Sequence, residues 1–271
     1  MATPLIPSRP LGIHTAGATP SCANCPVRQL CLPAGLDEEG VAGIDRLVER
    51  RHVLQRGDTL YQMDEPVHDR LYAIRSGSIK SYQLFADGVQ RIIGFPGDGD
   101  LLGLETLGAQ QHSGIASALN ECTVCELSYS RITAAARQST ALARQFETAL
   151  SKELARQQAS TLVLSYAHAD QKLANFLLAY GGSNARRGGS ATALQLPMTR
   201  QDMGDYLGLT DATVSRLLRQ LQRRGCLAVQ QRQITITDPD MLRAIAAGHQ
   251  PQPLTPPSGS SQPSGQKMAA A

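Results

Sequence analysis

The chain has 271 residues, and 26 Lys and Arg against 23 Asp and Glu give a formal net charge of +3 at pH 7. Hydrophobic residues make up 42% and charged residues 18%, which is ordinary for a globular protein with room for two modest domains. No apolar run of about 18 residues occurs, so no membrane span is predicted. Residues 1–12 hold three prolines and no apolar core. We therefore expect no secretory signal, no membrane partner and a cytoplasmic location.

Five segments follow one another along the chain. Residues 1–35 show little periodicity and hold three of the six cysteines. Residues 36–137 carry frequent Gly and Asp turn signals between apolar runs, which predict short antiparallel strands in a roll or barrel. Residues 138–169 contain no Gly or Pro and are predicted to form one long helix of roughly 30 residues. Residues 170–247 predict short helices followed by a two-stranded wing, and the Pro-, Ser- and Gly-rich tail 248–271 is predicted to be disordered.

Residues 198–225, "MTRQDMGDYLGLTDATVSRLLRQLQRRG", have the local signals of two helices joined by a sharp turn. Thr199 followed by Asp202 resembles a capping box, with Asp in place of the usual Glu or Gln. Gly208 lies where the chain must turn, and Thr210 is predicted to cap the second helix. These signals predict a helix-turn-helix.

The second of these helices has an apolar stripe and a basic face. The stripe is formed by Val214, Leu217, Leu218 and Leu221. The other face carries Ser215, Arg216, Arg219, Arg223 and Arg224. A basic face alone also fits a solvated amphipathic helix, but two caps, a Gly turn and the predicted wing at 227–237 occur together here. They predict a helix that enters the major groove of double-stranded DNA.

Three cysteines have the spacing Cys22-x2-Cys25-x5-Cys31, and Cys122 and Cys125 lie in a predicted strand. In a reducing compartment such thiols are more often ligands or redox sensors than disulfides. Three thiols need a fourth ligand to complete a zinc or iron–sulfur site. Because strand neighbours alternate, Cys122 and Cys125 should face opposite sides, and only one should meet the N-terminal segment. Spacing alone leaves iron–sulfur, zinc and a metal-free dithiol open.

At this point a family resemblance is visible. "MTRQDMGDYLGLT" and "TVSRLL" closely resemble the helix-turn-helix of FNR-type regulators in the cyclic-AMP-receptor/FNR superfamily. The segments "LYAIRSGSIKSY" (71–82) and "IIGFPGDGDLLG" (92–103) resemble the sensory β-roll of that superfamily, so the resemblance covers about 22–247. It implies an α+β fold: a cyclic-nucleotide-binding-like jelly roll, a long dimerisation helix and a C-terminal winged helix-turn-helix. It also implies a homodimer and a transcription regulator that touches RNA polymerase, not an enzyme.

The cysteine spacing before the roll and the strand "TVCEL" resemble those of FNR-type oxygen sensors. The resemblance implies one 4Fe–4S cluster per subunit, held by Cys22, Cys25, Cys31 and Cys125. In that family, oxygen converts the cluster to a 2Fe–2S form that favours monomers, and this controls anaerobic gene expression. Cys122 and Cys226 are expected to be small buried hydrophobic residues. The alternatives are a DNA-binding regulator with a structural zinc, or one with a dithiol redox site.

Other members of the superfamily bind cyclic AMP in the roll, with an Arg-Ser pair at the phosphate. The corresponding position here is His112-Ser113. A buried phosphate needs a fixed positive charge, which a mostly neutral histidine supplies poorly. We therefore expect no cyclic-nucleotide cofactor, and we expect His112 to be a loop residue.

The resemblance also assigns DNA contacts, to Thr199, Arg200, Ala212, Thr213, Ser215, Arg216 and Arg219. Arg216 should contact guanine in a base pair, while Thr199 and Arg200 are better placed for phosphate. Ala212 replaces a glutamate of the family pattern and cannot accept a hydrogen bond from cytosine. We expect a palindrome related to TTGAT–N4–ATCAA with an altered preference at one symmetric base pair.

The long helix is expected to need two apolar stripes, one against its own roll and one against the partner's helix. The candidate apolar positions are Leu142, Phe146, Ala149, Leu150, Leu154, Leu162 and Leu164. Gln157 and Gln158 are expected on the outer face, because a buried polar group without a partner would weaken the dimer.

Overall fold

A computed structural model describes residues 21–86, 88–166 and 168–248 of the chain. Among these residues, no helix is long and apolar enough to cross a membrane. The predicted disordered tail lies almost entirely outside them. The helices are α1 (Glu38–Leu47), η1 (Leu104–Thr106), α2 (Tyr129–Ala136), α3 (Thr140–Ser165), α4 (Ala169–Arg186), α5 (Arg200–Leu207), α6 (Asp211–Arg223) and α7 (Pro239–Ala246). The strands are β1 (Val48–Leu54), β2 (Thr59–Tyr61), β3 (Arg70–Ser76), β4 (Ile79–Leu84), β5 (Gln90–Gly94), β6 (Leu101–Leu102), β7 (Ile115–Ala118), β8 (Cys122–Ser128), β9 (Ala193–Gln195), β10 (Leu227–Gln230) and β11 (Gln233–Ile236).

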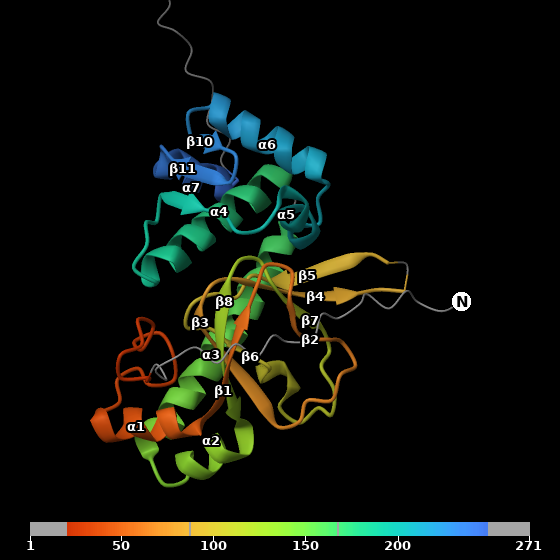
Figure 1. Cartoon of the computed structure of the whole chain (residues 1–271). Helices are drawn as coiled ribbons and strands as arrows, with labels where there is room; N and C mark the ends of the chain where they lie inside the picture. Colours follow the sequence, from red (N-terminus) through yellow and green to blue (C-terminus); the bar gives the residue numbers. More distant parts are fainter. Residues whose placement is uncertain (1–20, 87, 167, 249–271) are drawn as a thin grey trace, which may run out of the picture.

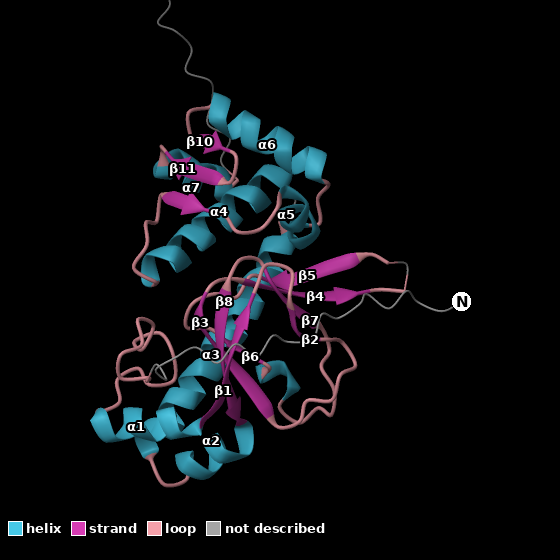
Figure 2. Ribbon diagram, viewed as in Figure 1, coloured by secondary structure: helices cyan, strands magenta, loops and turns pink. Residues whose placement is uncertain are grey.

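The first eight strands form two four-stranded antiparallel sheets, in the orders β1-β8-β3-β6 and β2-β7-β4-β5. Apolar side chains from both sheets, among them Leu54, Ile74, Ile79 and Val124, pack into one buried cluster between them. This is the predicted antiparallel roll. Figure 2 shows it below the C-terminal helices, with the β4–β5 hairpin projecting to one side.

Strand β8 lies between β1 and β3 and gives its sheet two different faces. Cys122 and Val124 belong to the cluster inside the roll. Cys125 and Leu127 belong to a second cluster, which includes residues of α1, α2 and α3. Side chains two residues apart share a face, so this arrangement follows from strand alternation. It separates Cys122 from Cys125, as the odd spacing predicted.

The structure corrects the predicted strands and helices at several points. Helices α1 and α2 lie within 36–137, where the sequence predicted strands throughout. Each begins with a side chain that accepts a hydrogen bond from its first turn, Asp37 in α1 and Ser128 in α2. The single helix predicted over 138–169 is α3, which is shorter because it ends at Ser165, and the next helix, α4, begins at Ala169. Figure 1 shows α3 running along the roll toward the C-terminal helices.

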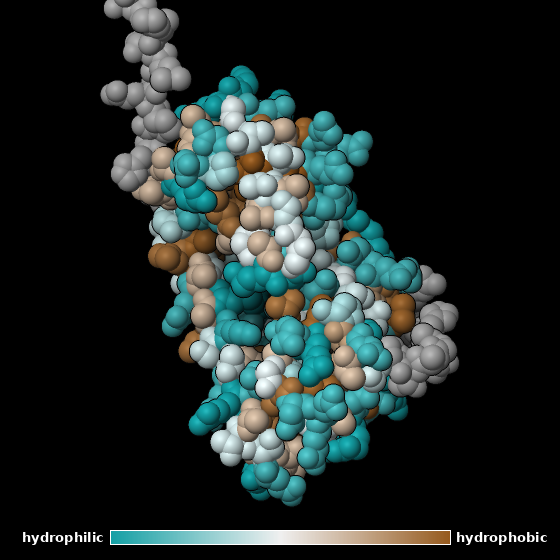
Figure 3. All heavy atoms as spheres, turned by 90° about the vertical axis from the view of Figure 1, so that its left-hand side faces the viewer, coloured by the Kyte–Doolittle hydropathy of each residue, from teal (hydrophilic) through white to brown (hydrophobic). Residues whose placement is uncertain are grey.

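The C-terminal part has its own core, which includes Leu173, Leu177, Leu207, Leu218 and Leu242. Its wing is three-stranded, in the order β10-β11-β9, and not two-stranded as predicted. Strand β9 is only three residues long, too short for a periodicity signal in the sequence. Helix α4, at 18 residues, is also longer than the short helices expected. On the face shown in Figure 3, hydrophobic residues form small separate areas among hydrophilic ones.

Candidate functional site

The cysteine-containing segment before α1 is folded by successive tight turns. Backbone hydrogen bonds join Cys25 N to Cys22 O at 3.3 Å, Cys31 N to Val27 O at 3.1 Å and Ala34 N to Cys31 O at 3.0 Å. Its first cysteine is tied to α1, because Cys22 N donates to Asp45 Oδ1 at 3.1 Å. The segment is thereby held against the sheet that carries β8.

This packing brings four cysteines to one pocket. Cys22, Cys25, Cys31 and Cys125 all line it, and the rest of its wall is mainly apolar. Cys122 is fully buried on the opposite face of β8, where its thiol donates to Ser78 O at 3.3 Å. Cys226 is fully buried in the C-terminal core, so both cysteines outside the pocket are the buried residues expected.

The strand register determines what surrounds Cys125. Arg51 on β1 and Ala73 on β3 are its direct partners on either side. Directly opposite residues of an antiparallel pair point to the same face. The small Ala73 side chain lines the pocket and leaves space beside the thiol. Arg51 brings a guanidinium to the same face.

One arginine of this pocket has a buried hydrogen-bond donor without an acceptor. Arg28 and Arg75 line the pocket. The Nε atom of Arg28 is buried and has no hydrogen-bond partner among the described residues, and the same is true of Arg51 on the neighbouring strand. Buried donors in native proteins are nearly always satisfied, so each exception needs an explanation. An anionic group in the pocket, held by thiolates, would give the Arg28 donor an acceptor and a counter-charge.

The thiols are held in their neutral form in the absence of such a group. Burial, assisted by Asp45, raises the pKa of Cys22 to about 12. Burial also raises the pKa of Cys31 to about 12. The pKa of Cys125 is raised by burial, although the Arg51 guanidinium acts in the opposite direction. Metal binding needs thiolates, so it must release these protons.

The four thiols share a pocket without meeting at one point. Within the described ranges, no three His, Cys, Asp or Glu side chains converge closely enough to hold one metal ion. Four thiolates on a single zinc ion lie within about 4 Å of one another, because each Zn–S bond is about 2.3 Å. An iron–sulfur cluster also takes four thiolates, so the donor set in this pocket fits such a cluster.

The helix-turn-helix is built as its local sequence predicts. Thr199 and Asp202 form a reciprocal capping box at the start of α5. Gly208 ends that helix with a φ of 67°, in the left-handed region that favours glycine. Thr210 caps α6 by accepting from Thr213 N at 3.2 Å. The apolar stripe of α6 is buried, which leaves its opposite face to solvent.

The predicted DNA contacts lie at the start of α5 and along α6. Arg200, Ala212, Arg216 and Arg219 are exposed, while Thr199, Thr213 and Ser215 are half-buried. Two of the predicted residues also contact each other, since Arg200 donates to Ser215 Oγ at 3.2 Å. The Ser215 hydroxyl in turn donates to Asp211 Oδ1 at 3.4 Å. This network links the start of α5 to the first turns of α6, and the sequence did not predict it.

Three aromatic rings stack on one another within the roll. The His112 ring stacks on Tyr61 with centroids 3.9 Å apart, and Tyr61 stacks on Tyr72 at 5.8 Å. His112 is outside the strands, as predicted for a loop residue, but its side chain is only 2% exposed. Burial lowers the pKa of His112 and favours the neutral ring. A neutral stacked ring offers no fixed charge to a phosphate.

Two family descriptions match the chain. Residues 51–139 match the cyclic nucleotide-binding domain, and residues 171–245 match the Crp-like helix-turn-helix domain. They correspond to the roll and to the C-terminal part of the structure.

Relatives match most of the chain. Fumarate and nitrate reduction regulatory proteins of Salmonella typhimurium and Escherichia coli K12 are each 38% identical over 237 residues, covering 88% of this chain and 94% of theirs. The structure of FixK2 from Bradyrhizobium japonicum matches with a TM-score of 0.63 and 33% identity, over 71% of this chain and 94% of that one. A transcriptional regulator of the CRP family from Thermus thermophilus shares the fold at a TM-score of 0.59 and 20% identity, over 72% of this chain and 96% of its own. The expected fold is thereby confirmed, and the chain belongs to the CRP/FNR family of DNA-binding transcription regulators, with the fumarate and nitrate reduction regulatory proteins as relatives.

Proposed function

We propose that this regulator is a cytoplasmic, oxygen-responsive protein that controls anaerobic gene expression through a 4Fe–4S cluster, one per subunit. Cys22, Cys25, Cys31 and Cys125 would be the ligands. When bound, such a cluster supplies iron that reacts with oxygen. The protein's part is to hold four thiolates around it and to limit the access of water and oxidants through the apolar wall.

The observation that carries this proposal is the four-cysteine pocket. Its donor set is entirely sulfur, the ligand type that iron–sulfur clusters and zinc both accept. The resemblance of the cysteine spacing to that of FNR-type oxygen sensors favours the cluster over zinc. Hydrogen bonds to cluster sulfurs are a recognised means of tuning such centres.

The route from the pocket to DNA runs through a homodimer. Near its N-terminal end, α3 buries Leu142 and Phe146 against its own subunit. Further along, it exposes Leu154, Leu162 and Leu164, at 62%, 57% and 47%. A second copy of the helix would cover exposed leucines of this kind, although Leu162 and Leu164, two residues apart, lie on opposite sides of the helix and cannot both belong to one stripe. Gln157 is half-buried and donates to Glu153 of its own helix, while Gln158 is exposed.

In the proposed dimer, two helix-turn-helix units read half-sites one helical turn apart, as two-fold symmetry requires. Arg216 would read guanine, and Arg200 would contact phosphate while bonded to Ser215. The proposed target is a palindrome related to TTGAT–N4–ATCAA, and the proposed partner in activation is RNA polymerase. A roll interior filled by Tyr61, Tyr72 and His112 supports a regulator without a cyclic-nucleotide cofactor.

The test is metal analysis of protein purified without oxygen. We expect a brown protein with about four iron and about four acid-labile sulfide per chain, whose visible absorbance bleaches in air. A colourless anaerobic protein with one zinc per chain and no sulfide would establish the structural-zinc alternative. A metal-free protein whose thiols oxidise reversibly in pairs would establish the dithiol alternative.

A further inference from the structure

The turn formed by residues 96–100 touches the cysteine segment. Gly99 has a φ of +84°, and a Cβ placed on it would overlap the Cβ of Leu30, the residue before Cys31. No side chain fits there, so the backbone of the turn lies directly against Leu30. A displacement of Leu30 would therefore move either this turn or the cysteine segment.

Hydrogen bonds fix the turn to β3 and its following loop. Gly99 N donates to Ile74 O at 2.8 Å, and Ile74 N donates to Asp100 O at 3.0 Å. Asp98 Oδ1 accepts from Gly77 N at 2.7 Å. Because several bonds hold it, the turn moves as a unit with the end of β3. A movement of Leu30 against Gly99 would therefore shift the whole turn.

The same turn binds the DNA-binding part of the chain. Arg187 directly follows α4, and its Nε donates to Asp98 O at 3.0 Å. Its terminal nitrogen lies 2.5 Å from Asp100 Oδ2, and only 18% of the Arg187 side chain is exposed. A Cβ on Gly97 would lie 3.1 Å from the guanidinium, so the missing side chain gives Arg187 its place. Because the planar guanidinium of Arg187 donates to two acceptors, both its orientation and its distance from the turn are fixed.

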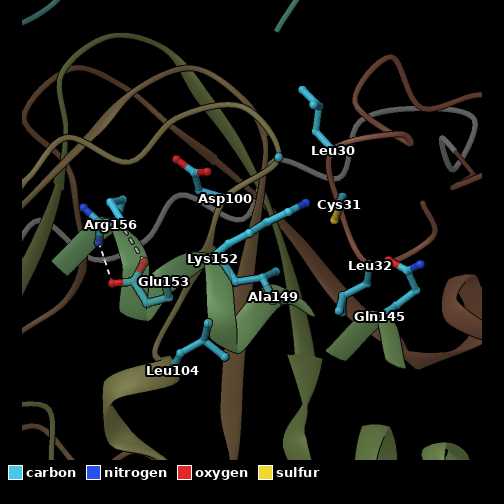
Figure 4. Close-up of a pocket in the computed structure, with 12 residues that line it drawn as sticks. Leu30, Cys31, Leu32, Asp100, Leu104, Gln145, Ala149, Lys152, Glu153 and Arg156 are labelled. Atoms are coloured by element: carbon cyan, nitrogen blue, oxygen red, sulfur yellow. Dashed lines mark hydrogen bonds and ion pairs between the residues drawn. The ribbon is translucent and has the colours of Figure 1, made fainter. Parts of the chain in front are cut away.

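Figure 4 shows that the dimerisation helix reaches this place too. Leu30, Cys31 and Asp100 line one side of a pocket, and Lys152, Glu153 and Arg156 of α3 line the other. Arg156 is fixed by a two-nitrogen ion pair to Glu153, at 2.7 and 2.8 Å. The cysteine segment, α3 and the DNA-binding part thus all border the turn 96–100.

We propose that Arg187 is a positioning residue that transmits the state of the cysteine segment to the helix-turn-helix through the turn 96–100. This route acts in parallel with any change in dimerisation. When Cys31 gains or loses the cluster, Leu30 moves and displaces Gly99. Asp98 and Asp100 accept hydrogen bonds from Arg187, so their movement shifts Arg187 and the end of α4. The proposal rests on the proposed function for its signal, but the mechanical link exists in the cluster-free chain as well.

The chain offers a matched control. Arg186 precedes Arg187, carries the same charge and is exposed. Arg187→Gln and Arg186→Gln therefore remove the same charge from the same helix end. Only the first removes the bonds to the turn.

The first measurement is DNA affinity of the full-length protein with and without air, alongside its monomer–dimer constant by sedimentation. Arg187→Gln should lower the ratio of anaerobic to air-exposed affinity by at least about fivefold, the lower end of typical coupling. The dimerisation constant should remain that of the wild type, and Arg186→Gln should keep the wild-type ratio. The proposal would be overturned if Arg187→Gln and Arg186→Gln had the same ratio of anaerobic to air-exposed affinity. It would also be overturned if a changed dimerisation constant accounted for the whole effect of Arg187→Gln.

The second measurement uses cluster-free protein and hydrogen exchange, so it does not depend on oxygen sensing. Leu30→Gly, which removes the Cβ that lies against Gly99, should speed amide exchange at residues 187–193, and should have no further effect there when Arg187→Gln is already present. Equal effects of Leu30→Gly in both backgrounds would show that the turn does not link these parts. If the DNA affinity of the wild type did not change in air, the proposed function would be refuted. The hydrogen-exchange result would still show whether the turn 96–100 connects Leu30 to Arg187.

Discussion

Arg51 on β1 lies directly opposite Cys125 on β8, and the same guanidinium forms an ion pair with Asp45 Oδ1 at 3.0 Å. Asp45 also accepts a hydrogen bond from the backbone nitrogen of Cys22. One carboxylate and one guanidinium therefore connect the first and last cysteines of the proposed site. Groups of this kind orient metal ligands without binding the metal themselves.

Replacing Arg51 should weaken the proposed cluster without removing a ligand. Arg51→Gln leaves the cysteines in place but removes the positive charge and the buried donor beside Cys125. We expect iron to be lost to a chelator about 10-fold faster under anaerobic conditions, the lower end of typical effects. Arg50→Gln, at the neighbouring position on β1, is the control and should behave as the wild type. Equal iron loss in both variants would rule out a role for Arg51 at the site.

The two strand cysteines should differ in a serine exchange. Cys125 lines the pocket, while Cys122 lies on the other face of the same strand. Cys125→Ser should abolish anaerobic iron loading, because a hydroxyl is a far weaker ligand for iron than a thiolate. Cys122→Ser should load nearly normally, as should Cys226→Ser. Iron content measured per folded chain checks this, and loading that fails in Cys122→Ser but not in Cys125→Ser would reverse the assignment.

The capping box of α5 predicts how the stability of the protein depends on pH. Burial opposes the charge on Asp202, but hydrogen bonds from Thr199 and the Lys80 ammonium outweigh it, and the pKa is lowered from 3.8. Lys80 Nζ lies 3.0 Å from Asp202 Oδ1, so the roll stabilises this carboxylate directly. A lowered folded pKa means stability that is present above about pH 4 and lost as pH falls through the folded value.

Asp202→Asn should therefore lower the free energy of unfolding of the protein by about 1.5–3 kcal/mol at pH 7. The difference from the wild type should shrink below pH 4, where the wild-type carboxyl also loses its charge. Thermal unfolding at several pH values measures both. Asp240→Asn is the control, because its side chain is 94% exposed and its ion pair should contribute little. A difference that grows toward low pH would contradict the sign of this argument.

The caps, the Gly208 turn and the apolar stripe of α6 were all predictable, because they depend on residues within a few positions of one another. The pairing of Arg51 with Cys125 was not, since residues 74 positions apart meet only through the sheet register. Helix α2 was missed for a similar reason. Its sequence, "YSRITAAA", is short, and its start depends on the Ser128 cap and on packing of Ile132.

In the helix-turn-helix, too, local features were predictable and contacts between distant residues were not. The outer position of Arg216 follows from helical periodicity, but the contact of Arg200 with Ser215 depends on how α5 crosses α6. Likewise, the burial of His112 against Tyr61 could not be read from a loop sequence. The ligands and base contacts are predictions from the resemblance, and the structure added the arginines and carboxylates around those residues.

Ala212 should alter which base pair the protein prefers. It is exposed in the first turn of α6, next to Asp211, whose carboxylate is already bonded to Ser215. An engaged carboxylate is a poor substitute for the glutamate found in the family pattern. We expect Ala212→Glu to gain discrimination at one symmetric base pair by about 1–3 kcal/mol. A binding selection with anaerobic wild type and variant checks this, and identical half-sites with equal stringency would contradict it.

In the proposed function, oxygen acts on DNA binding through the four-cysteine pocket. The direct measurement is fluorescence anisotropy of a labelled palindrome, titrated with one protein sample before and after exposure to air, at fixed salt. We predict that affinity falls at least about 10-fold as the visible absorbance bleaches, which is roughly 1.4 kcal/mol of binding free energy. Sedimentation of the same samples should show a shift toward monomer. An affinity that stays unchanged while the absorbance disappears would contradict the account.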